Sequence, residues 1–99
     1  FELIYGCSRM MEKRSDLDAI IAIGSVIRGE TAHFDHVCSA TAQGIARLND
    51  RASIPVLFCV LTDENKQQAI DRSGGRLGNK GTEAAVAAVE MAILRKDLS

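Results

Sequence analysis

His33 is the side chain in this sequence whose type and position best suit acid–base chemistry. It lies in residues 24–35, which follow an apolar run and open a helical pattern. In the first turn of a helix, the positive end of the helix dipole favours the neutral imidazole. A neutral imidazole can accept and return a proton near neutral pH. On composition alone a surface histidine without a role is the commoner outcome, so both interpretations stay open.

The residues before His33 could bind an anion. They follow a predicted parallel strand, and ligands of open α/β sheets bind at the carboxyl ends of the strands. Gly29 lets a ligand approach the backbone, and the free N–H groups at the start of a helix favour phosphate. Thr31 is expected to cap that helix. Many α/β loops carry such a pattern, so alone it favours a phosphate site only weakly.

Two further cations lie beside glycine-containing turns. Arg72 precedes Ser-Gly-Gly at residues 73–75 and could bind phosphate through two N–H groups, although a solvated arginine is the usual alternative. Lys80 could complete an anion site, with Glu83 facing the same way about one turn later. Phe58 lies in an apolar segment, and a place in the core is favoured over stacking on a substrate.

A metal site is not expected. His33, His36 and Cys38 are candidate ligands, but Cys38 lies off the helix face that the two histidines share. The three cysteines are odd in number and lie in apolar or helical surroundings. They are interpreted as reduced packing residues of a cytoplasmic protein rather than as a disulfide framework.

The apolar spacing predicts the elements that position these residues. It predicts a helix over 3–14, a buried parallel strand over 19–23, a helix from Thr31 to residues 49–50, a second buried strand over 54–61 and a short helix capped by Thr62. A break at 78–81 precedes a last helix whose inward face is Ala85, Val86, Val89, Ala92 and Ile93. Strand, helix and strand form a βαβ unit, so the fold class is α/β.

Two apolar strands are too few for a stable parallel sheet, because both sheet edges would lack backbone partners. We therefore expect further strands to come from elsewhere. The sequence begins at Phe1, at the edge of a periodic segment, and we expect residues upstream of it.

The composition indicates one small globular domain. The chain has 99 residues, of which 46% are hydrophobic and 25% charged, and its net charge is -1. This near-neutral charge does not favour nucleic acid or an acidic membrane surface as a partner. No apolar run approaches the roughly 20 residues that span a bilayer, so no membrane partner is expected.

Four segments together resemble the lumazine synthase family in order and spacing. These segments are residues 26–35, 55–62, 68–74 and 78–85, and Phe1-Glu2 is similar to the Phe-Glu before the family's second helix. The resemblance implies a three-layer αβα sandwich with a parallel, flavodoxin-like sheet, of which this chain supplies only part. It also implies that residues 1–99 form a single domain lacking its N-terminal portion, which in the family carries further strands and an aromatic residue that stacks on the pyrimidine.

The family's activity is implied in the same way. Lumazine synthases are transferases of riboflavin biosynthesis that need neither metal nor cofactor. They condense 5-amino-6-ribitylamino-pyrimidinedione with 3,4-dihydroxy-2-butanone 4-phosphate, release phosphate and form 6,7-dimethyl-8-ribityllumazine. The site lies between adjacent subunits of a pentamer, and some members build 60-subunit icosahedral shells. The alternative is a catalytically incomplete shell or scaffold subunit of the same family.

Carried over by position, the resemblance implies roles for individual residues. His33 becomes the proton-transfer residue, and Arg72 the phosphate ligand, assisted by Gly29, Glu30 and Thr31. The residues implied to contact substrate, or to lie near it, are Phe1, Glu2, Val26, Ile27, Phe58, Lys80 and Glu83. Phe58 and Arg72 should come from one subunit and the His33 loop from its neighbour, or the reverse.

Overall fold

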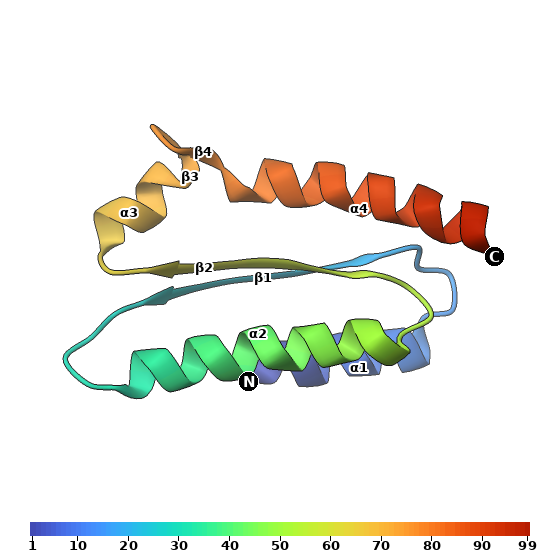
Figure 1. Ribbon diagram of the computed structural model, residues 1–99, viewed down its shortest axis with the longest axis horizontal. Coiled ribbons are helices and arrows are strands. Elements are labelled where there is room, and N and C mark those ends of the chain that lie inside the picture. The colour runs from blue at the N-terminus through green and yellow to red at the C-terminus, as the bar shows by residue number, and fades with distance from the viewer.

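Helices cover both faces of a short parallel sheet. The computed structural model describes all 99 residues. Its elements are α1 (Glu2–Lys13), β1 (Ile20–Ile27), α2 (His33–Arg51), β2 (Val56–Asp63), α3 (Lys66–Asp71), β3 (Ser73–Gly75), β4 (Gly78–Asn79) and α4 (Lys80–Leu98). Helices α1 and α2 lie on one side of β1 and β2, and α3 and α4 lie on the other (Figure 1). The predicted α/β class and its three layers are confirmed.

The main sheet has only two strands. β1 and β2 pair in parallel from Ile20 with Val56 to Ile27 with Asp63, and no further strand joins them. Both strands run two or more residues beyond their predicted ends because the ladder continues through Gly24. The prediction that the first strand ends at residue 23 is therefore wrong, and so is the predicted cap at Thr62. Asn65 caps α3 instead, through a side chain that accepts from the Gln68 N–H.

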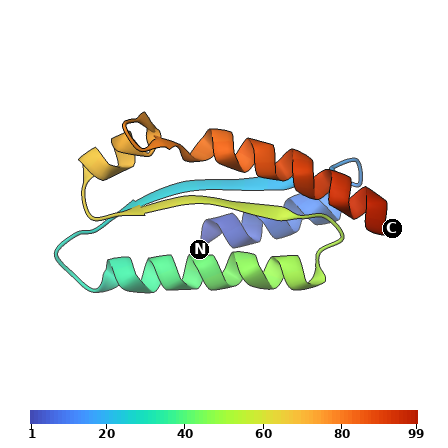
Figure 2. The ribbon, with the colours of Figure 1, turned by 45° about the horizontal axis from the view of Figure 1, so that its top comes forward.

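Figure 2 shows α1 and α2 on one side of the sheet, and the residues of the main core lie between these layers. The buried members of this core are Cys7, Ile20, Ala22, Ile45, Ile54, Val56 and Val60. Gly44 allows α1 and α2 to approach closely, since a Cβ atom there would lie 2.5 Å from Ile4 Cγ1. Burial raises the pKa of the Cys7 thiol, and Cys7, Cys38 and Cys59 are all free, as expected for packing residues.

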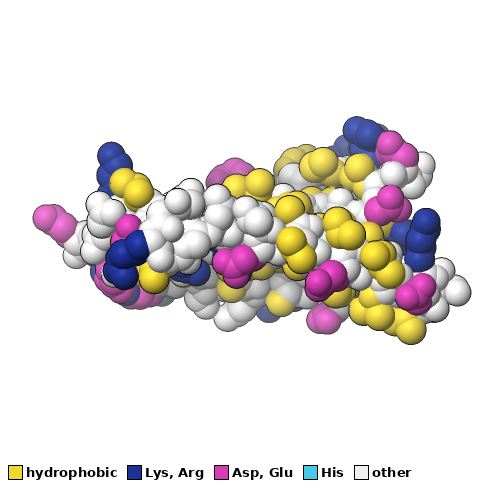
Figure 3. Space-filling view, turned by 90° about the horizontal axis from the view of Figure 1, so that it is seen from above, with side chains coloured by type: hydrophobic (Ala, Val, Ile, Leu, Met, Phe, Trp, Pro, Cys, Tyr) yellow, Lys and Arg dark blue, Asp and Glu magenta, His cyan; other side chains and the backbone are white.

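On the opposite layer, α4 packs through its alanines. Ala84 is buried, and the half-buried alanines are Ala87, Ala88 and Ala92. The predicted inward face is wrong for four of its five residues. Ala85 is exposed, and Val86, Val89 and Ile93 are each more than half exposed. The sheet is only two strands wide, so the small side chains meet it and the larger ones extend past it. Figure 3, which looks onto this layer, shows hydrophobic side chains along its surface.

The same narrow sheet leaves one face of β1 only partly covered. Burial alternates along its second half, and Ile23 is 67% exposed on the side of α4. The prediction of a strand buried on both faces is therefore wrong for β1. None of the helices is both long enough and apolar enough to cross a membrane.

Asn49 fastens the end of α2 to the start of β2. Its amide nitrogen donates to the carbonyls of Ile45 and Val56, and its Oδ1 accepts from the Val56 N–H at 2.8 Å. We expect Asn49→Ala to lower the free energy of unfolding by about 1–3 kcal/mol, because part-buried backbone groups lose their partners. Urea denaturation of the intact protein measures this loss. Gln43→Ala, on the exposed face of the same helix, should change it by less than about 0.5 kcal/mol; equal losses would contradict the role of Asn49.

Candidate functional site

Arg28 holds the loop that joins β1 to α2. Its N–H extends the ladder by donating to the Asp63 carbonyl at 2.9 Å. Its guanidinium donates to Glu64 Oε2 at 2.7 Å and to Asp35 Oδ1 at 2.9 Å, and it lies 4.5 Å from the centre of the Phe34 ring. The bond to Asp35 is the main reason that the pKa of Arg28 is raised. Sequence reasoning missed Arg28. Its place shortly before Phe34 and Asp35 was the feature that could have indicated it.

His33 is the first residue of α2, so it lies in the first helical turn as predicted, and its side chain is exposed. Thr31 does not cap the helix in the predicted way. The N-cap residue is Ala32, without a side-chain bond, and Thr31 Oγ1 accepts only a long 3.4 Å bond from the His33 N–H. A Cβ atom at Gly29 would meet nothing within 4 Å. The space in front of the loop that carries Gly29, Glu30 and Thr31 is therefore open to a ligand.

Arg72 lies beyond the end of α3, fixed at its backbone. Its N–H donates to the Gln68 carbonyl at 3.1 Å, and its own carbonyl accepts from the Lys80 N–H at 2.8 Å. Its side chain is 38% exposed, and Nη1 lies 3.3 Å from Asp63 Oδ1. Asp63 is the last residue of β2 and a neighbour of the site. Sequence reasoning missed it because α3 separates it from its partner Arg72 along the chain.

The β3–β4 hairpin brings Lys80 beside Arg72. These two strands pair antiparallel around residues 76–77 and return the chain to the end of α3. α4 then begins at Lys80, and Asn79 Oδ1 caps it by accepting from the Thr82 N–H at 3.0 Å. The predicted break at 78–81 is thus a strand end, a cap and the first helical turn. Glu83 lies exposed in that turn.

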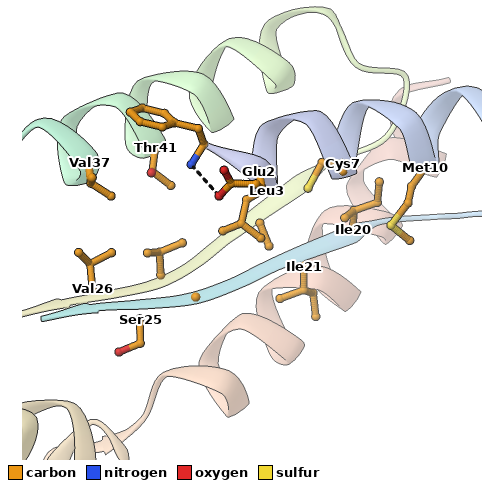
Figure 4. A pocket seen from close by; sticks show the side chains of 15 residues that line it. Glu2, Leu3, Cys7, Met10, Ile20, Ile21, Ser25, Val26, Val37 and Thr41 are labelled. Carbon is orange, nitrogen blue, oxygen red and sulfur yellow. Dashed lines mark ion pairs between the residues drawn. The ribbon is translucent and has the colours of Figure 1, made fainter.

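A cavity of about 390 Å³ runs along β1 (Figure 4). Phe1, Glu2 and Val26 are among its lining residues, and most of its walls are apolar. Leu3, Val26, Val37 and Thr41 line it from α1, β1 and α2, while Ile21 and Ser25 lie on the other side of β1 (Figure 4). Since residues from both faces of β1 line it, the cavity reaches the unpaired edge of this strand.

One copy of the chain divides the predicted site residues into separate groups. Phe1, Glu2 and Val26 share the cavity, whereas His33, Arg72 and Phe58 do not line it. Phe58 lies opposite Ala22 in the middle of β2 and is 36% exposed, so its predicted place in the core is wrong. Part of the aromatic ring is therefore available at the surface.

The structure gathers no metal-binding group. No three side chains among His, Cys, Asp and Glu lie close enough together to hold an ion, and this includes those around His33. The acidic groups at the site instead pair with arginines, as Asp35 and Glu64 do with Arg28.

The family model and the similar proteins found by comparison all carry the same description. The family model described as 6,7-dimethyl-8-ribityllumazine synthase matches residues 1–96. A protein of that name from Christiangramia forsetii is 62% identical over 97 residues, which are 98% of this chain and 58% of the relative. Those from Flavobacterium johnsoniae and Porphyromonas gingivalis are 60% and 51% identical over 100% and 97% of this chain. The chain spans 52% and 59% of those two relatives.

Proposed function

Because the chain belongs to the 6,7-dimethyl-8-ribityllumazine synthase family, we propose that the intact protein has this activity. It is a transferase of riboflavin biosynthesis that joins 5-amino-6-ribitylamino-pyrimidinedione to 3,4-dihydroxy-2-butanone 4-phosphate without metal or cofactor. The observation that carries the proposal is 62% identity to a relative of that name across 98% of the chain.

His33 moves protons in this reaction. The 5-amino group of the pyrimidine attacks the ketone, a first water leaves, and the resulting imine loses phosphate. The ribitylamino nitrogen then attacks the carbonyl that this elimination produces, and loss of a second water completes the ring. Each step needs a proton removed or returned at a carbon, nitrogen or oxygen atom of the substrate. The exposed imidazole at the start of α2 is free to do this, and the bonds of Arg28 hold the loop before it.

Arg72 and the loop over residues 29–31 bind the phosphate group. Arg72 uses one nitrogen for Asp63 and keeps other N–H donors on its exposed side. The backbone of Gly29, Glu30 and Thr31 offers a second set of donors before α2, next to open space. The leaving group is thus held by fixed positive groups while its bond to carbon breaks.

The remaining site residues bind the pyrimidine substrate. Glu2 is fully exposed beside the cavity and can accept hydrogen bonds from ribityl hydroxyls, with Phe1 next to it. Val26 and Ile27 border the heterocycle, Phe58 stacks from a neighbouring copy, and Lys80 and Glu83 supply charge near the phosphate.

The complete site forms between copies of the protein. A single copy leaves the Phe58 ring exposed and separates it from the cavity, and it also exposes Val86, Val89 and Ile93 on α4. We propose a pentamer, or a 60-subunit shell of pentamers, working in the cytoplasm, where free cysteines are common. The unpaired edge of β1 is where the rest of the intact protein adds to the sheet.

Product formation by the intact protein tests the activity. Mixing it with the two substrates should give 6,7-dimethyl-8-ribityllumazine, followed by its absorbance, with one inorganic phosphate released for each product. If light scattering shows a large assembly but no product forms above the uncatalysed rate, the shell or scaffold alternative holds and the proposed activity is wrong.

Arg72→Ala tests the phosphate contact. We expect the dissociation constant for inorganic phosphate, measured by isothermal titration calorimetry, to rise by about tenfold, because a charge-assisted pair is lost. Arg76→Ala removes an arginine of the same hairpin whose side chain is 74% exposed and should leave that constant unchanged. An unchanged affinity in Arg72→Ala would count against the contact.

A further inference from the structure

Asp63 is a buried carboxylate with too few partners. Its side chain is 3% exposed, Oδ1 has the single contact with Arg72 at 3.3 Å, and Oδ2 has no hydrogen-bond partner. Burying a charged group in this way is costly unless a nearby cation compensates it. Arg72 is the cation that does so, which ties the two side chains to each other.

The β1–β2 ladder fixes the backbone of Asp63. Asp63 pairs with Ile27 at the end of the ladder, and its carbonyl accepts from the Arg28 N–H at 2.9 Å. The carboxylate therefore stands at the carboxyl end of the sheet, within the same framework that holds the His33 loop. Its position is set by the backbone rather than by a flexible chain.

The backbone of Arg72 is fixed as well, but its side chain has several free torsions. α3 holds the Arg72 N–H, and Lys80 holds its carbonyl. The contact between Nη1 and Asp63 Oδ1 is the one polar contact that the guanidinium makes. Without it the side chain would sample many rotamers, and binding an anion would have to order it.

We propose that Asp63 is a positioning residue, which holds the Arg72 guanidinium in the orientation that binds the phosphate of the substrate. This rests on the proposed function of Arg72. Asp63 itself does not touch the phosphate. It occupies one nitrogen of Arg72 and leaves donors on the exposed side of the group for a bidentate contact.

The direction in which phosphate affinity changes when Asp63 is removed distinguishes this positioning role from simple electrostatics. A negative charge next to an anion site repels the anion, so charge alone predicts tighter phosphate binding when Asp63 is removed. Positioning predicts the opposite. We expect Asp63→Ala to raise the dissociation constant for inorganic phosphate by about threefold to tenfold, up to the whole effect of Arg72→Ala. Asp63→Asn keeps an oxygen for Arg72 and should lose less affinity.

Steady-state kinetics of the intact protein give a readout that a purely structural role would not move. In Asp63→Ala, KM for the phosphate-bearing substrate should rise, while KM for the pyrimidine should stay the same. Asp71→Asn is the matched control, since this buried carboxylate pairs with Arg76 and also accepts from Gln67. It should lower the melting temperature without a change in phosphate affinity.

A double-mutant cycle completes the test. In the Arg72→Ala background, Asp63→Ala should have no further effect on phosphate binding. If Arg72→Ala weakens binding while Asp63→Ala leaves it unchanged or tighter, the positioning role is wrong and the phosphate contact stands. If Arg72→Ala changes nothing, both are wrong. A KM that rises equally for both substrates, or an equal effect in Asp71→Asn, also overturns the proposal.

Discussion

His33→Ala is expected to slow formation of the lumazine product by about a hundredfold at saturating substrates. This is the lower end of the range for general acid–base catalysis, because the imidazole is exposed and water can take over part of its task. The side chain makes no hydrogen bond that holds the loop, which Arg28 fastens instead. The change should therefore lower kcat and leave both KM values nearly as they are. Stopped-flow or steady-state absorbance of the product measures the rate.

His36 provides the control on the same helix. It is also exposed, lies about one turn from His33, and has no proposed role in the reaction. His36→Ala should therefore keep the rate of the unchanged protein. An unaffected rate in His33→Ala, or an equal loss in both variants, would reject proton transfer by His33.

The layers of the fold could be predicted because they follow from spacing within single segments. Apolar residues three and four apart predicted α1 and α2, and continuous apolar runs predicted β1 and β2. The ends were less accurate. Residues 24–27 carry Gly24 and Ser25, which favour a loop locally, but the parallel ladder with β2 extends the strand to Ile27. Tertiary pairing overrode local preference.

The orientation of α4 could not be predicted, because both of its sides carry apolar residues. Alanines and larger aliphatic residues alternate around the helix, so periodicity does not identify the buried side. The structure turns Ala84 to the sheet and leaves Val89 62% exposed. Which side is buried depends on the width of the sheet, and that width is not encoded in the helix itself.

In the candidate site, too, features within one segment could be predicted and contacts between distant segments could not. His33 and Arg72 became candidates because of their types and the turns beside them, and the resemblance to the family favoured them. Arg28 and Asp63 were missed because their importance lies in partners that are distant in sequence, such as Glu64 for Arg28. The contact between the Arg72 carbonyl and the Lys80 N–H likewise depends on the β3–β4 hairpin, whose short strands have no apolar pattern.

Ile45→Ala is expected to give the largest loss of stability. Ile45 is 1% exposed and is the largest fully buried side chain of the chain. It packs in the core between α2 and the strands, so its truncation leaves a cavity that close neighbours cannot fill. The expected decrease in the free energy of unfolding is about 2–5 kcal/mol, whereas Ile45→Val should cost about 0.5–1.5 kcal/mol. Denaturant unfolding of the intact protein gives both values.

Leu98→Ala is the control for losing aliphatic surface, since Leu98 is 77% exposed at the end of α4. It should lower the free energy of unfolding by less than about 0.5 kcal/mol.

The effect of Ile45→Ala on activity should also differ from that of His33→Ala. Because α2 carries His33 at its first residue, a folded Ile45→Ala protein should keep its kcat at low temperature and lose activity only as it unfolds on warming. A large fall in kcat below the unfolding transition would mean that Ile45 supports the site directly rather than through the core.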